Sequence, residues 1–210
     1  EFPKLMAVES IGSSYEGRDI PLVTVTNTET GPHDEKPAVF VHAQIHAMEF
    51  TGTTAALSLL ERLLHDYGSD GRVTQALDTR TFYVVPRVNP DGADAGLADG
   101  RFRRSSVRPY PRDEPQDGLH REDVDGDGRV LLMRQPDPNG AWKLHPDDPR
   151  LLIARKPDDV AGEFFRVFPE GRIQNWDGVT VKIAPVVEGL DLNRNWPADW
   201  APEGDQQGAG

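Results

Sequence analysis

The chain has 210 residues, of which 37% are hydrophobic and 28% charged, and it contains no cysteine. Its formal charge of -12 disfavours nucleic acid or an anionic membrane as the main partner, because both repel an acidic surface. The length suits one domain with a single core, and no apolar run reaches the ~18 residues that a membrane span needs. Without thiolates, any metal must be held by histidine, aspartate or glutamate.

The first half of the chain alternates strand and helix signals. Residues 20–26 are rich in β-branched side chains and predict a strand. Residues 36–44, KPAVFVHAQ, are apolar on both faces, which is typical of a central strand. Leucines then recur at helical spacing in residues 50–68, and residues 81–85 predict a third strand, closed by an Asn-Pro-Asp-Gly turn at 89–92. This order predicts an α/β domain with parallel crossovers.

The character of the chain changes over about residues 94–187. Proline, glycine and charged residues dominate there, and only short apolar runs such as VLLM interrupt them. A loop-rich stretch of this length inside a compact domain is uncommon and tends to be functional or fixed by a bound ion. We therefore interpret residues 94–187 as a long insertion.

The stretch HAQIHAMEF places His46 and Glu49 three residues apart, just after the predicted central strand. In the first turn of a helix, these two side chains can point to one side, and imidazole plus carboxylate suits zinc. Taken alone, the pattern occurs by chance in many proteins and favours a histidine bonded to a backbone carbonyl and an acidic residue in a first helical turn. His42, inside the strand, is interpreted as a strand histidine.

Two further stretches carry cationic or amide side chains suited to anions. RFRRSS places Arg101, Arg103 and Arg104 together in an acidic chain, either as a solvated loop or as a site that stabilises developing negative charge. GLDLNRNWP contains Asn193 and Arg194, an amide beside a guanidinium, which together can hold a carboxylate.

An aspartate-rich segment, EDVDGDGRV, follows the start of a calcium-binding loop. Asp123, Asp125 and Asp127 alternate before Gly128, as carboxylates that converge on a hard cation do. The twelfth position counted from Asp123 is Arg134, where a bidentate glutamate would be expected. A true EF-hand is therefore disfavoured, and a calcium-stabilised loop and a plain acidic turn stay open.

In order along the chain stand SIGSSYEGRDI, HAME, VNPDG, RFRRS and GLDLNRNW. This series resembles the zinc carboxypeptidases of the carboxypeptidase A type, the M14 peptidases. The resemblance implies an α/β fold with a mixed, mostly parallel twisted sheet flanked by helices. DVDGDGRVLLMR and DPNGAWK also resemble an insertion in some bacterial members of the family, which favours the calcium interpretation of Asp123, Asp125 and Asp127.

The resemblance implies a role for each matching residue. His46 and Glu49 look like two zinc (Zn2+) ligands, and Arg103 like the group that polarises the scissile carbonyl. Asn193 and Arg194 look like the pair that holds the terminal carboxylate of the substrate. Met48 departs from the basic residue that some members carry between the histidine and the glutamate.

Family members have a third zinc ligand and a glutamate general base downstream of the Asn-Arg motif. We therefore expect residues 1–210 to be one truncated catalytic domain, with these two groups beyond residue 210 and little activity in the fragment alone. The intact protein is expected to hydrolyse the C-terminal peptide bond of peptides that end in a free carboxylate.

Other functions stay open on the same residues. The intact protein could hydrolyse cell-wall peptides or acyl-amino acids, or be a noncatalytic module that binds carboxylates or calcium (Ca2+). The absence of cysteine and the aspartate-rich loop favour a secreted or periplasmic location. The sequence carries no signal for an oligomeric state.

Overall fold

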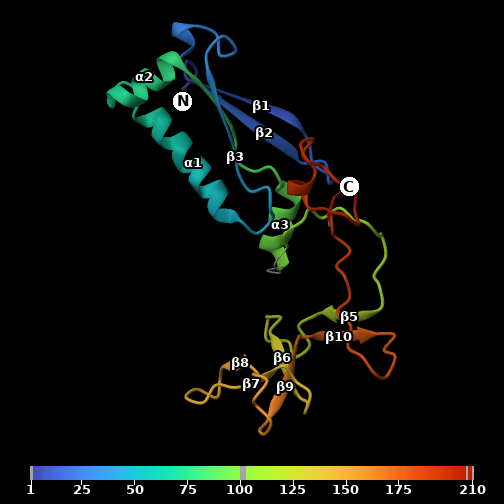
Figure 1. Cartoon of the computed structure of the whole chain (residues 1–210). Helices are drawn as coiled ribbons and strands as arrows, with labels where there is room; N and C mark the ends of the chain where they lie inside the picture. Colours follow the sequence, from blue (N-terminus) through green and yellow to red (C-terminus); the bar gives the residue numbers. More distant parts are fainter. Residues whose placement is uncertain (1, 100–102, 207, 210) are drawn as a thin grey trace. The chain divides into compact units, whose positions relative to one another are not determined.

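The computed structural model describes residues 2–99, 103–206 and 208–209, and the chain divides into two compact units (Figure 1). Unit 1 comprises Glu1–Glu114 and Val186–Gly210, and unit 2 comprises Pro115–Pro185. The sequence predicted a single domain with an insertion over about residues 94–187, and this stays a prediction. Unit 2 lies within the bounds of that insertion. None of the helices in the described part of the chain has the length and apolar character to cross a membrane.

Unit 1 is built on a four-stranded mixed sheet with the strand order β1-β2-β4-β3. Strand β2 pairs antiparallel with β1 and β4, whereas β3 and β4 are parallel. The mixed α/β fold expected from the sequence is confirmed, with the parallel pairing of this sheet confined to β3 and β4. The strands are β1 Met6–Ser13, β2 Asp19–Val25, β3 Ala38–His42 and β4 Thr81–Val85.

Two helices lie on one side of this sheet and close its core (Figure 1). Helix α1 spans Phe50–His65, and its leucines at helical spacing pack on β2 and β4. Helix α2, Gly71–Thr79, begins at Asp70, whose carboxylate accepts from the N–H of Arg72 at 2.8 Å. The buried cluster that joins these elements contains Val23, Val25, Ala56, Leu60, Leu63, Leu64, Val73, Leu77 and Val84.

Strand β3 lies at the edge of the sheet in the described residues, whereas its apolar run predicted a central strand. Phe40 is 60% exposed and Val39 40% exposed as a result. An apolar run has the same pattern whether one or two neighbouring strands pair with it, so the sequence could not distinguish these arrangements.

Residues 89–92 begin helix α3, Pro90–Asp99, and do not form the closing turn that the sequence predicted. Asn89 acts as the N-cap, since its Oδ1 accepts from the N–H of Gly92 at 3.0 Å. Pro90 follows at the first helical position, where a missing N–H costs nothing. Turns and helix N-termini favour the same residue types, and this is why the pattern was misread.

Unit 2 contains two small antiparallel sheets joined by turns. One pairs β5, Gly118–Arg121, with β10, Gly171–Gln174. The other has the order β6-β9-β7-β8 and buries Phe164 and Phe165 on β9, one of its two inner strands. Its strands are β6 Leu132–Pro136, β7 Trp142–Leu144, β8 Leu152–Ala154 and β9 Phe164–Pro169. These strands are too short to give a periodic sequence signal.

A buried carboxylate ties the turn between β1 and β2 to the start of α3. Asp91 is 2% exposed and accepts from Ser14 Oγ at 2.6 Å, from the N–H of Glu16 at 2.9 Å and from Arg18 Nη1 at 2.7 Å. Burial raises the pKa of Asp91, but these hydrogen bonds outweigh it, and the pKa lies below its ordinary value. Asp91 is therefore ionised at neutral pH and fixes α3 against the sheet.

Replacing Asp91 with alanine should lower the free energy of unfolding by about 2–3 kcal/mol, because charged donors lose their buried acceptor. The pKa of Asp91 is lower in the folded chain than the ~3.9 of an unfolded aspartate. The stability that ionised Asp91 contributes is therefore fully present well above about pH 4, and it is lost as the pH falls toward the pKa of Asp91 in the folded chain. Urea unfolding of both proteins at several pH values measures it. The matched control is Asp94→Ala, which removes an exposed partner of Arg18 and should cost about 0.5 kcal/mol. Equal losses at Asp91 and Asp94 would contradict this account.

Candidate functional site

The loop between β3 and α1 carries His46 and Glu49 and is fixed from within. Gln44 has a positive φ of 53° and is 3% exposed. Its Nε2 donates to the carbonyl of Ala47 at 2.9 Å, and its Oε1 lies 2.6 Å from Thr53 Oγ1 on α1. These buried contacts offset the cost of a left-handed residue and hold the turn that presents His46.

His46 and Glu49 face each other across this turn. His46 Nδ1 lies 2.8 Å from Glu49 Oε1, and the side chain of His46 is 9% exposed. Glu49 immediately precedes α1, but its side chain makes no capping hydrogen bond and turns to His46 instead. The structure therefore brings the two predicted metal ligands together. An imidazole nitrogen beside a carboxylate is a donor pair that zinc accepts.

Asp191 lies on the other side of the imidazole and was missed by the sequence analysis. Its Oδ1 is 3.4 Å from His46 Nε2, although that nitrogen has no hydrogen bond of good geometry to any described residue. Asp191 Oδ2 accepts from Arg104 Nε at 2.8 Å. Burial raises the pKa of Asp191, but hydrogen bonds from Arg104 and the N–H of Asn193 outweigh it and lower the pKa. The only local signal was an aspartate two residues before Asn193, at a cap position.

The imidazole of His46 lies between two carboxylates, and a neutral imidazole has only one N–H to donate. The neutral ring carries one N–H, so either the side toward Glu49 or the side toward Asp191 faces an anion without a proton. A cation at Nδ1, with the proton on Nε2, satisfies both sides. This geometry, with the buried Nε2 beside Asp191 and Nδ1 beside the exposed carboxylate of Glu49, fits a bound zinc ion.

The loop that carries His46 is bonded to the segment that carries Arg103. The N–H groups of Ala47 and Met48 donate to the carbonyls of Arg104 and Arg103, at 3.1 and 3.2 Å. Asn89, 2% exposed, adds a second connection, since its Nδ2 lies 3.3 Å from the carbonyl of Ile45 and 3.2 Å from that of Ser105. These bonds keep the two segments in register.

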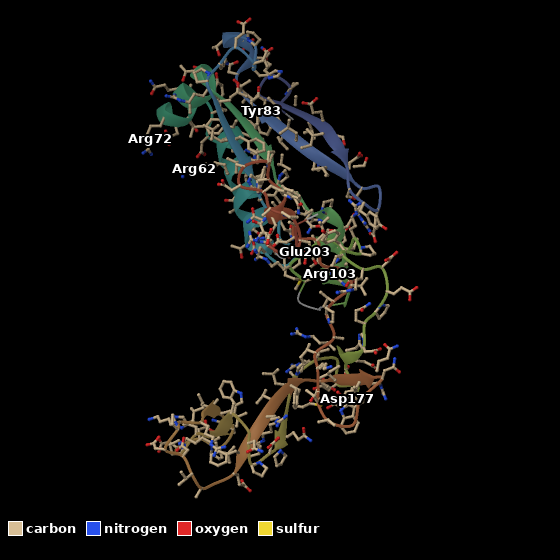
Figure 2. All side chains as sticks on the ribbon, turned by 45° about the vertical axis from the view of Figure 1, so that its right-hand side comes forward. Arg62, Arg72, Tyr83, Arg103, Asp177 and Glu203 are labelled. Carbon is tan, nitrogen blue, oxygen red and sulfur yellow. The ribbon has the colours of Figure 1, made fainter. Side chains whose placement is uncertain are left out.

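Arg103, labelled in Figure 2, has a side chain that is 11% exposed, and its Nη2 lies 3.5 Å from Glu188 Oε1. A guanidinium held in this way can offer its donors to an anion without much loss of side-chain entropy. Arg101 of the same basic stretch lies outside the described residues. Arg104 is paired with Asp191 and takes a supporting place behind His46.

Asn193 and Arg194 lie in a 3-10 turn, η2, Leu192–Arg194. Asp191 caps this turn by accepting from the N–H of Asn193 at 2.9 Å. The carboxylate beside His46 thus also positions the two predicted carboxylate-binding residues, which are half-buried. A cavity of about 430 Å³ lies between the end of β3 and α1 and is lined by Glu49 and by apolar residues that include Val41, Ile45 and Leu59; Asn193 and Arg194 are not among its lining residues.

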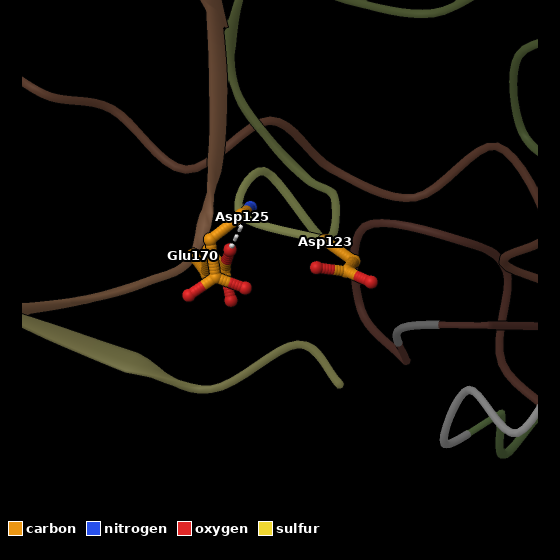
Figure 3. Close-up of side chains that lie close together, drawn as sticks. All are labelled: Asp123, Asp125 and Glu170. Atoms are coloured by element: carbon orange, nitrogen blue, oxygen red, sulfur yellow. Dashed lines mark hydrogen bonds between the residues drawn. The ribbon is translucent and has the colours of Figure 1, made fainter. Parts of the chain in front are cut away.

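The aspartate-rich loop of unit 2 brings Asp123 and Asp125 together with Glu170 (Figure 3). One ligand atom of each lies within 4.8 Å of the others, and Asp127 is not in this group. Glu170 is buried, and its carboxylate accepts from the N–H groups of Val124 at 2.7 Å, Leu131 at 3.2 Å and Asp125 at 3.2 Å. These bonds lower the pKa of Glu170 and fold the loop around it.

Comparison with known proteins adds an independent result. The sequence profile of the M14 peptidase family, described as zinc carboxypeptidase, matches residues 1–209. The chain is 37% identical over 106 residues to carboxypeptidase A2 of Mus musculus, which covers 50% of this chain and 24% of that protein. It is 35% identical over 91 residues to a protein of Saccharomyces cerevisiae named an inactive metallocarboxypeptidase, which covers 43% of this chain and 21% of that protein.

A crystal structure of thrombin activatable fibrinolysis inhibitor is similar to the chain with a TM-score of 0.49 and 26% identity, over 53% of this chain and 27% of that one. The chain spans between 21% and 41% of the length of the curated relatives it matches.

Replacing Asp191 with asparagine should weaken zinc binding to the chain about tenfold, because the anion that fixes and polarises the imidazole of His46 is lost. Competition with a chromophoric chelator measures the affinity. The matched control is Asp66→Asn, at the far end of α1, which should bind zinc as the wild type does. Equal zinc affinity in the Asp191 variant and the wild type would show that Asp191 does not support the ligand.

Proposed function

The chain belongs to the zinc carboxypeptidase family, and on this premise we propose that the whole protein removes one residue from the carboxyl end of a peptide. The observation that carries the proposal is the imidazole of His46 between the carboxylates of Glu49 and Asp191. A cation at Nδ1, between His46 and Glu49, satisfies both sides of the ring, and the donor set suits zinc.

In this proposal His46 and Glu49 hold the metal, and Asp191 orients His46 from behind. Zinc supplies Lewis-acid activation of water for hydrolysis. The third ligand and the general base, expected beyond residue 210, stay predictions.

The cationic and amide groups then have separate tasks. Arg103 donates to the carbonyl oxygen of the scissile bond and stabilises the negative charge that develops there. Arg194 and Asn193 bind the terminal carboxylate, the arginine through two parallel donors. Recognition of a free carboxylate restricts cleavage to the end of the peptide. The capping of η2 by Asp191 supports this division, because one carboxylate fixes both His46 and the turn that carries Asn193.

Replacing Arg194 with alanine in the whole protein should raise the KM for peptides with a free carboxylate about ten- to hundredfold, since a charge-assisted bidentate contact is lost. Peptides capped as carboxamides should be hardly affected. Initial-rate kinetics with the two peptide series measures the difference. The matched control is Arg62→Ala, an exposed arginine in the last turn of α1, labelled in Figure 2. Equal losses on both series would refute the role of Arg194.

A second candidate is a protein that binds carboxylates without hydrolysing them. The similarity to a Saccharomyces cerevisiae protein named an inactive metallocarboxypeptidase is the observation that favours this second candidate. Hydrolysis of peptides by the whole, zinc-loaded protein separates the two, because a binding protein would show carboxylate affinity and no turnover. A secreted or periplasmic location stays a prediction in both cases.

Calcium at the aspartate-rich loop also stays a prediction. The hydrogen bonds from the backbone to Glu170 and Asp123 account for the fold of the loop without an ion. If calcium binds there, millimolar calcium should raise the unfolding temperature of the chain, and Asp125→Asn should remove the increase. Magnesium is the control ion. An unfolding temperature that does not change with calcium would contradict the prediction.

A further inference from the structure

Trp196 makes a hydrogen bond that fixes the direction of the Asn193 side chain. Its indole Nε1 lies 2.9 Å from Asn193 Oδ1. An indole N–H donates and never accepts, so the atom of the carboxamide that faces it must be the oxygen. The contact therefore assigns the oxygen and nitrogen of the Asn193 carboxamide on chemical grounds.

The rest of Asn193 is also held in place. Its backbone N–H donates to Asp191 Oδ1 at 2.9 Å, and its carbonyl accepts from Arg194 Nη1 at 3.0 Å. With Oδ1 on Trp196, the two N–H donors of Nδ2 point away from the indole. Asn193 thus presents donors, and Arg194 adds a positive charge beside them.

Trp196 is in turn supported by the end of β3. Its ring lies 5.6 Å from that of His42, between centroids, and His42 lies 5.8 Å from Phe40. This row of aromatic rings positions the indole by packing, independently of the hydrogen bond. A phenylalanine in place of Trp196 keeps the ring contact and removes only the donor.

We propose that Trp196 is a positioning residue for substrate binding, which holds the carboxamide of Asn193 with its N–H donors toward a terminal carboxylate. The inference rests on the proposed function, since it assumes that Asn193 and Arg194 bind that carboxylate. A carboxylate only accepts hydrogen bonds. A carboxamide turned by 180° would present its oxygen to the anion and repel it, so fixing the amide increases affinity for carboxylates.

The hydrogen bond itself is tested by NMR spectroscopy of the chain labelled with nitrogen-15. The four tryptophans give separate indole N–H signals, and Trp196→Phe identifies the signal of Trp196. Asn193→Ala should shift that signal and speed its exchange with solvent, while the signals of Trp142 and Trp176 stay in place. An unchanged Trp196 signal in the Asn193 variant would overturn the proposal.

The consequence for binding is tested with N-acetyl-L-phenylalanine and its carboxamide, titrated into the whole protein. Trp196→Phe should weaken binding of the carboxylate roughly three- to tenfold, the effect of one lost hydrogen bond, and change carboxamide binding less. The matched control is Trp200→Phe, because Trp200 is 47% exposed and Trp196 is 45% exposed. This control variant should bind both compounds as the wild type does. Thermal unfolding checks that both variants are folded.

The outcomes separate this inference from the proposed function. If the wild type prefers the carboxylate and Trp196→Phe binds it equally well, the role of Trp196 is refuted and the carboxylate site stands. If the wild type binds neither compound, or binds both alike, the carboxylate site is refuted and the proposed function fails with it.

Discussion

The carboxylate of Asp191 is the contact on which the site depends. It faces His46, pairs with Arg104 and caps the turn that carries Asn193. Three segments from different parts of the chain therefore converge on one buried anion. Its hydrogen bonds keep it ionised, and the imidazole of His46 lies between it and Glu49. One side chain thereby joins the two candidate metal ligands to the turn that carries Asn193 and Arg194.

Unit 2 is inserted in the sequence between two segments of unit 1 that both contribute to the candidate site. Arg104 and Asp191 are 87 residues apart, and Pro115–Pro185 lies between them. Within unit 1, the segments on either side pair with each other: Ser106 and Tyr110 donate to the carbonyls of Leu190 and Val187. Because this pairing closes the chain beside the site, unit 2 can fold on its own short strands.

The sequence predicted what local patterns determine. Strand β4, Thr81–Val85, has the bounds expected from its sequence before Pro86. His46 and Glu49 face each other as expected, but from the loop before α1 and not from the first turn of a helix, as the sequence predicted. The role of Asn89 as a cap, the edge position of β3 and the place of Asp191 depend on tertiary contacts that no local pattern encodes. Glu170 was missed for the same reason, since it reaches Asp123 and Asp125 from a distant strand end.

X-ray absorption spectroscopy of the zinc-loaded chain tests the central claim most directly. The account predicts zinc bound through one imidazole nitrogen at about 2.0–2.1 Å together with carboxylate oxygen, and loss of the imidazole signal on replacing His46 with alanine. Zinc bound by oxygen alone, or an imidazole signal that persists in the His46 variant, would contradict the shared site of His46 and Glu49.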